Sequence, residues 1–146
     1  MQSDDALRRL GAVDREMIEQ RIRTMVRMHS DGNLHGLFDL VADEVVYNVR
    51  GGWITFPYAK PVRGKKDVAA AMAMISVRFE NLGSVIHNLV IDGDRAAFLR
   101  TATIRHRGTG KTGDVDVVDF IRFRDGLVVE FTEIADSAAL ADLDES

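Results

Sequence analysis

The hydrophobic pattern of this 146-residue chain changes its period once, near Gly83. Before this glycine, except in the Val- and Tyr-rich segment 45–50, apolar residues recur with the spacing of amphipathic helices. After it, apolar and polar residues alternate, which is the spacing of half-buried strands. Because helices come first and the strands then follow one another through short turns, the order predicts an α+β fold with an antiparallel meander.

Turn and stop signals divide both parts into elements. Asp31-Gly32-Asn33 is typical of a helix end, and Asp-Gly pairs favour tight hairpin turns. A turn is expected near residues 4–10, and a C-terminal helix is expected to begin at Asp136, which is a good N-cap. The other expected elements are helices at 14–29, 34–41 and 67–79, and strands at 45–50, 84–92, 95–107, 114–124 and 127–135.

The composition is that of one domain, expected to span residues 1–146. Apolar residues make up 46% and charged residues 29%, which excludes a disordered chain. A net charge of −4 disfavours general nucleic-acid binding. The longest apolar run is far shorter than the ~20 residues that span a bilayer, and the N-terminal residues lack a signal-peptide pattern. We therefore expect a cytoplasmic protein that binds neither nucleic acid nor membranes.

The sequence predicts neither a metal nor a cofactor. Cysteine is absent, and the histidines at positions 29, 35, 87 and 106 lack the paired spacing of metal ligands. The segment GTGKTG resembles part of a phosphate loop, but Arg105 stands where the first glycine is required. This segment also joins two expected strands, so no helix N-terminus follows it to bind phosphate.

One face of the strand expected at 114–124 carries a single carboxylate, Asp119, among apolar side chains. A charge in that place must be paired, neutralised or turned to a cavity, because burying it alone is costly. Folding the hairpin about the centre of GTGKTG places Ala102 opposite Asp119. Arg100 is then a diagonal neighbour of Asp119, within reach of its long side chain.

Glu133 lies on an otherwise apolar face of the last expected strand. Three adjacent strands therefore each contribute one ionisable group to the same surface, from Arg100, Asp119 and Glu133. The pattern is typical of a pocket with acid–base chemistry, and a closed structural ion-pair network would have the same pattern.

The opposite face of the strand at 114–124 is also partly apolar, with Val118 and Phe120. A strand that is apolar on both faces is usually covered on both. We expect the helices to cover one face and a second subunit to cover the other.

Several segments in order resemble the SnoaL-like group of the nuclear-transport-factor-2-like superfamily: GNLHGLFDLVADEVVYN, VRGKKDVAAAM, VIDGDRAAF and VVDFIRFRDGLVVEFTEIADSAAL. The resemblance implies a cone-shaped, cystatin-like α+β barrel. In that fold a curved antiparallel sheet wraps around a long N-terminal helix and leaves an apolar pocket, and dimers commonly form through the convex sheet face. Its members include steroid isomerases, limonene-type epoxide hydrolases, polyketide cyclases and non-catalytic binders, so the fold does not name a reaction.

The resemblance to ketosteroid isomerases is incomplete. It places Asp119 where those enzymes hold a neutral carboxylic acid that donates to the oxyanion. Their general base falls at Val49, and their helical tyrosine falls near Met25. Neither side chain can transfer a proton, so steroid isomerase activity by that mechanism is not expected.

The resemblance to limonene-type epoxide hydrolases keeps a different subset of residues. Arg100 falls at the central arginine of an Asp–Arg–Asp arrangement, Glu133 at one of its aspartates, and Tyr47 at a tyrosine that holds the nucleophilic water. The accompanying asparagine falls near Val49, next to Asn48. This alternative predicts an ordered water between Glu133, Tyr47 and Asn48.

The resemblance to SnoaL-type cyclases implies an aspartate with a nearby histidine, here Asp119 and His106. Apolar walls would raise the pKa of Asp119 and allow it to remove a proton beside a carbonyl, with His106 assisting. His106 is also close to the expected turn, where it could be a solvated rim residue.

We therefore expect a small-molecule-binding protein that catalyses cofactor-independent isomerisation, cyclisation or dehydration of an apolar carbonyl or enol compound. A non-catalytic binding or assembly module and an epoxide hydrolase are the alternatives. The expected catalytic residues are Asp119, Arg100, Glu133, Tyr47 and His106. The expected ligand-binding residues are Met25, His29, Val49, Trp53, Phe56, Tyr58, Ala102, Val117, Ile121 and Phe131.

Overall fold

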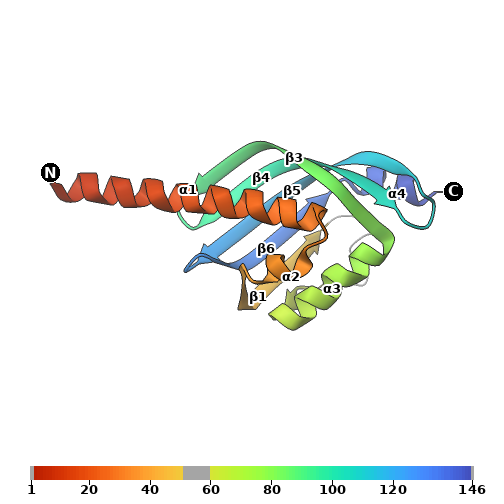
Figure 1. Ribbon diagram of the computed structural model, residues 1–146, viewed down its shortest axis with the longest axis horizontal. Coiled ribbons are helices and arrows are strands. Elements are labelled where there is room, and N and C mark those ends of the chain that lie inside the picture. The colour runs from red at the N-terminus through yellow and green to blue at the C-terminus, as the bar shows by residue number, and fades with distance from the viewer. Residues whose placement is uncertain (1, 51–59, 146) are drawn as a thin grey trace.

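A computed structural model describes residues 2–50 and 60–145, in which four helices and six strands are formed (Figure 1). Trp53, Phe56 and Tyr58 lie outside the described residues. The elements are α1 (Gln2–Ser30), α2 (Leu34–Phe38), β1 (Val41–Arg50), β2 (Val62–Arg63), α3 (Lys65–Arg78), β3 (Phe79–Asp92), β4 (Arg95–His106), β5 (Thr112–Arg124), β6 (Leu127–Ala135) and α4 (Ser137–Asp144).

The N-terminal helix is longer than expected. The turn predicted near residues 4–10 is part of α1, whose first turn carries Asp4 and Asp5 at the positive end of the helix dipole. The helix ends at Ser30, directly before the predicted stop signal, and Gly32 adopts a positive φ of 74° as predicted. Asp136 caps α4, also as predicted, and its side chain accepts the backbone N–H of Ala139.

The sheet has the strand order β2-β1-β6-β5-β4-β3. The antiparallel meander from β3 to β6 is confirmed. The sheet is mixed, however, because β1 pairs with β6 in parallel, with Tyr47 opposite Phe131. After β1 the chain passes through α3 to the far edge, and the returning meander brings β6 back beside β1 in the same direction (Figure 1). The fold is a cone-shaped α+β fold, as the resemblance implied.

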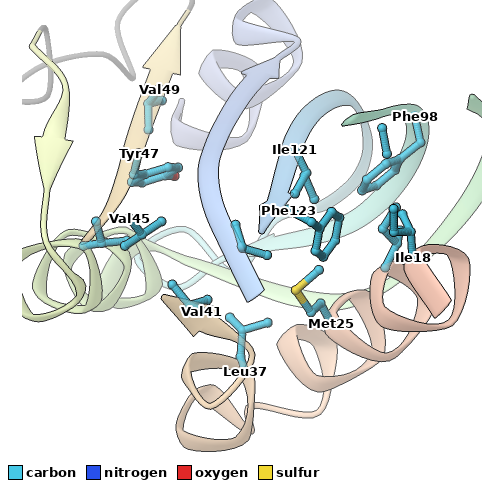
Figure 2. Close-up of a cluster of buried hydrophobic side chains, with 14 of the residues drawn as sticks. Ile18, Met25, Leu37, Val41, Val45, Tyr47, Val49, Phe98, Ile121 and Phe123 are labelled. Atoms are coloured by element: carbon cyan, nitrogen blue, oxygen red, sulfur yellow. The ribbon is translucent and has the colours of Figure 1, made fainter. Parts of the chain in front are cut away.

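The C-terminal half of α1 packs against the concave side of the sheet, whereas its N-terminal half extends beyond the sheet (Figure 1). Ile18, Ile22 and Met25 are buried at the three- and four-residue spacing of one helix face. They meet inward-facing side chains of the strands, among them Phe98 and Phe123 (Figure 2). Removal of this apolar surface from water is the main force that holds the helix in the cone.

The predicted register of the β4–β5 hairpin is wrong by four residues. Ala102 lies opposite Val115, and Phe98 is the residue opposite Asp119. The chain turns earlier than the centre of GTGKTG, directly after His106. Because a shift by an even number keeps every side chain on its face, Arg100 remains a diagonal neighbour of Asp119.

The ring of His106 explains the early turn. Its Nδ1 atom accepts the backbone N–H groups of Gly108, at 3.1 Å, and Thr109, at 3.0 Å. The ring is buried edge-on against Phe79, and Nε2 lies 2.8 Å from Asp144 without forming a well-aligned hydrogen bond. His106 is therefore a turn-forming residue, and it is not among the residues that line the cavity at Asp119.

Replacement of His106 by alanine should destabilise the fold without affecting ligand binding. The two backbone N–H groups would lose their acceptor, which costs about 1–3 kcal/mol in the free energy of unfolding. Urea denaturation measures this loss. The matched control is His35→Ala, at an exposed position, which should change the same free energy by less than about 0.5 kcal/mol. Equal stability of the two variants would contradict this role of the ring.

Candidate functional site

The three ionisable side chains predicted to share a face meet inside the cone. The guanidinium of Arg100 on β4 donates from Nε to Asp119 Oδ2, at 2.7 Å, and from Nη2 to Glu133 Oε2, at 3.2 Å. Its Nη1 donates to Ser84 Oγ on β3, at 3.1 Å. Each guanidinium nitrogen thus has a partner on a different strand, on β5, β6 or β3, which fixes the group in position.

Alternation along the strands places these groups on the concave side. Residues 115, 117, 119, 121 and 123 of β5 are all buried, so Asp119 is the one carboxylate in an apolar row. The side chain of Arg100 is buried as well. One atom of this pair has no partner, because Asp119 Oδ1 is buried without a hydrogen bond within the described part of the chain. A buried polar atom without a partner is costly, and such atoms are concentrated at functional sites.

Burial raises the pKa of Asp119 to about 6. Loss of hydration is the largest cause, and the negative charge of Glu133 acts in the same direction. The nearby Arg100 lowers the pKa but does not outweigh burial. The carboxyl group therefore changes its charge close to neutral pH.

Tyr47 supports the network from β1. Its hydroxyl donates to Glu133 Oε1 at 3.4 Å, and its ring stacks on Phe131 with the ring centres 5.0 Å apart. Burial and the charge of Glu133 raise the pKa of Tyr47 above its usual value, so the hydroxyl stays protonated. The parallel pairing of β1 with β6 creates this contact, because Val49 is opposite Glu133 and Tyr47 is two residues away.

A cavity of about 70 Å³, called the main cavity below, lies beside this network. Its walls are almost entirely apolar, and its polar lining residues are His29, Arg100, Asp119 and Glu133. Such a cavity with a few convergent polar groups is the usual form of a small-molecule site. The apolar lining residues are Ile22, Met25, Val26, Leu37, Phe38, Val41, Val45, Val68, Met72, Phe98, Ile121, Val128 and Phe131.

His29 enters the main cavity from the last turn of α1, across from the sheet. Its burial lowers the pKa of the ring to about 4, and the positive charge of Arg100 adds to this effect. The imidazole is therefore neutral at physiological pH. Within the described residues its side chain makes no hydrogen bond, so its ring nitrogens can bond a ligand.

The other predicted pocket residues divide into three groups. Met25, His29, Ile121 and Phe131 line the main cavity. Ala102 and Val117 instead line a second cavity that also borders Arg100. Val49 is buried in the core and lines neither cavity. The structure therefore places Val49 in the packed core and not at a cavity wall.

The water site predicted from the epoxide hydrolase resemblance is not formed. Asn48 donates to Thr132 Oγ1, at 3.4 Å, on the outer face of the sheet. Tyr47, the preceding residue, points to the inner face toward Glu133. Successive residues of a strand point to opposite faces, so the two side chains cannot hold one water with Glu133.

Sequence analysis did not identify Ser84 or the lining residues of α3. Ser84 is on the inward face of β3, and its alternation with Ile86 was the available signal. Val68 and Met72 of α3 line the main cavity at a spacing of one helical turn. The surrounding segment is rich in Ala and Met, and its apolar residues lie on several sides of the helix. The sequence therefore did not indicate which side faces the cavity.

Two further observations concern metal ions and membranes. Within residues 2–50 and 60–145, no three His, Asp or Glu side chains gather as a metal ion requires. None of the helices in the same ranges has both the length and the apolar content to cross a membrane.

Solved structures share this fold. A protein of the nuclear-transport-factor-2-like type from Burkholderia xenovorans LB400 is 25% identical, with a TM-score of 0.68 over 89% of this chain and 97% of that one. An LEH-like epoxide hydrolase from M. tuberculosis is 15% identical, with a TM-score of 0.66 over 84% of this chain and 85% of that one. TerC, crystallised with polyporic acid, is 19% identical, with a TM-score of 0.73 over 87% and 97%.

A search of curated proteins finds no match. The family of SnoaL-like domains, in contrast, matches residues 22–131, which include the C-terminal part of α1, α2, α3, the strands β1 to β5 and the first part of β6. The matched segment therefore contains Arg100 and Asp119. The chain belongs to the SnoaL-like domain family, within the nuclear-transport-factor-2-like superfamily.

Proposed function

We propose that the protein binds a small, mostly apolar molecule with a carbonyl or enol group, and that it catalyses proton transfer on this molecule without a cofactor. One observation carries the proposal. Asp119 Oδ1 is buried without a partner beside the apolar main cavity, while Oδ2 is held by Arg100. A closed ion-pair network would give both carboxylate oxygens a partner, whereas Asp119 lines the main cavity with one oxygen unpaired.

The pKa of Asp119 suits a general base. At a pKa near 6 the carboxylate remains mostly ionised at neutral pH, and it is more basic than an aspartate in water. The apolar walls that raise the pKa also exclude the water that would otherwise solvate the base.

The proposed step begins with Asp119 Oδ1 removing a proton from the carbon next to the carbonyl. The electron pair of the broken C–H bond forms a C=C bond, and the carbonyl π electrons move to oxygen, which gives an enolate. In a ligand with a further C=C bond at the β,γ position the enolate is extended to a dienolate, and return of the proton to its γ carbon completes an isomerisation. Arg100 is a positioning residue that leaves Oδ1 free for the substrate, and Glu133 with Tyr47 holds the guanidinium.

Replacement of Asp119 by asparagine should abolish proton transfer. General-base catalysis contributes about 10²–10⁴-fold, so we expect at least a 100-fold slower exchange of α-protons for deuterium. The measurement is ¹H NMR of apolar ketones in D₂O with the protein present. Asp116→Asn is the matched control, because Asp116 is on the same strand but on the outer face. Unchanged exchange with Asp119→Asn would rule out this base.

The exchange rate should fall as the pH decreases through about 6, because the base must be ionised to accept a proton. The negative charge of Glu133 raises the pKa of Asp119, so Glu133→Gln should move the midpoint of the pH profile to lower pH. Glu130→Gln, on the outer face of the same strand, should leave the midpoint in place. A midpoint unaffected by Glu133→Gln would contradict the assignment to Asp119.

We also propose that two copies of the chain associate through the outer, convex face of the sheet. Apolar side chains are exposed there, including Phe120 at 49% and Val90 at 64%. Along the outer face of β5, acidic Asp116 is followed by Val118 and Phe120 and then by basic Arg122. A two-fold axis through the centre of this row would place each acidic end against the other copy's basic end.

Phe120→Lys should convert the proposed dimer to a monomer, because it places two like charges at the centre of the contact. Sedimentation equilibrium measures the mass. Val77→Lys is the control, since Val77 is 72% exposed on α3, away from the outer face of the sheet. A wild-type protein that is monomeric at all concentrations would disprove the association.

A further inference from the structure

A second cavity of about 70 Å³ also borders the ionisable network. Residues of α3, β3, β4, β5, β6 and α4 contribute to its wall, and most of them are apolar. Asp119 is not among its lining residues, whereas Arg100 and Glu133 are. The lining residues are His29, Ile75, Ser76, Phe79, Asn81, Arg100, Ala102, Ile104, Val115, Val117, Glu133, Ala135 and Leu140.

The two cavities share three lining residues, which are His29, Arg100 and Glu133. Arg100 and Glu133 approach from the sheet, and His29 approaches from α1. The shared boundary is therefore polar, whereas the wall on each side of it is apolar. In the described part of the chain, the imidazole of His29 has no hydrogen-bond partner across this boundary.

The depth of the second cavity depends on small side chains. Ala102 is fully buried on β4, directly next to the boundary, and a larger residue there would occupy cavity space. Val115 and Val117 of β5 form the adjoining wall. The mechanism proposed above uses none of these residues, so that mechanism leaves this apolar wall without a role.

We propose that the main and second cavities are two halves of one ligand site, and that the ligand's carbonyl or enol group joins two apolar portions, one in each cavity. This inference rests on the proposed function and names the substrate class. The polar group would lie at the shared boundary, between His29 on one side and Arg100 with Glu133 on the other. A compound with its carbonyl near one end would leave one apolar wall uncovered.

Two isomeric ketones test the inference with the wild-type protein. Nonan-5-one has equal apolar chains on both sides of its carbonyl, and nonan-2-one has a single methyl group on one side. Their composition and apolar content are the same, so a difference in affinity reports the position of the carbonyl. Because each buried methylene contributes about 0.8 kcal/mol, we expect nonan-5-one to bind at least about tenfold more tightly by isothermal titration calorimetry.

Ala102→Val then tests the second cavity itself. It should weaken binding of nonan-5-one by about tenfold, because the added methyl groups occupy the space for one chain, and leave nonan-2-one within about twofold. Ala96→Val is the matched control. Ala96 is buried on the same face of β4 and lines neither cavity, so this variant should retain the preference for nonan-5-one.

The possible failures are distinguishable. Equal affinity of the wild-type protein for the two ketones, or equal weakening of both by Ala102→Val, would overturn the two-cavity inference and leave the proposed function in place. If neither ketone binds to the wild-type protein, both the inference and the proposed function are overturned. The comparison of isomers needs no variant, so it decides the matter even where Ala102→Val does not fold.

Discussion

The ion pair between Arg100 and Asp119 determines how the rest of the site is built. Burial removes both groups from water, and this cost is offset only when each charge has close partners. The sheet supplies those partners from four strands, through Ser84, Glu133 and the ion pair itself. Because the guanidinium bonds neighbours on both sides of β4, it can occupy only one position. The position of the free carboxyl oxygen follows from it.

The same burial gives the site its chemical character. The apolar walls come from α1, α2, α3 and the sheet. They raise the pKa of Asp119 and lower that of His29, because burial disfavours the charged form of each group. An arginine in the same environment keeps its charge. Arg100 therefore keeps a fixed positive charge, whereas the charges of Asp119 and His29 depend on pH. Hydrogen bonds from Tyr47 and Arg100 hold Glu133 in place as the counter-charge.

Strand alternation was enough to predict that Asp119, Arg100 and Glu133 share a face, since it depends only on the order of residues along each strand. The hairpin register was not predictable in this way, because the ring of His106 binds the backbone and moves the turn. Parallel pairing of β1 with β6 joins segments far apart in the chain, and no local pattern reports it. That Asp119 Oδ1 lacks a hydrogen-bond partner could be recognised only from the positions of the surrounding described residues.

The position of β6 between β1 and β5 has a consequence for biosynthesis. A ribosome makes β1 and β5 before β6, so each has an open hydrogen-bonding edge until the last strand emerges. Open edges are the places where strands of different chains pair and aggregate. Glu133 arrives on that same strand, and its carboxylate then completes the set of partners around Arg100. The sheet is therefore closed and the site completed at the same late stage of synthesis, when β6 pairs with β1 and β5.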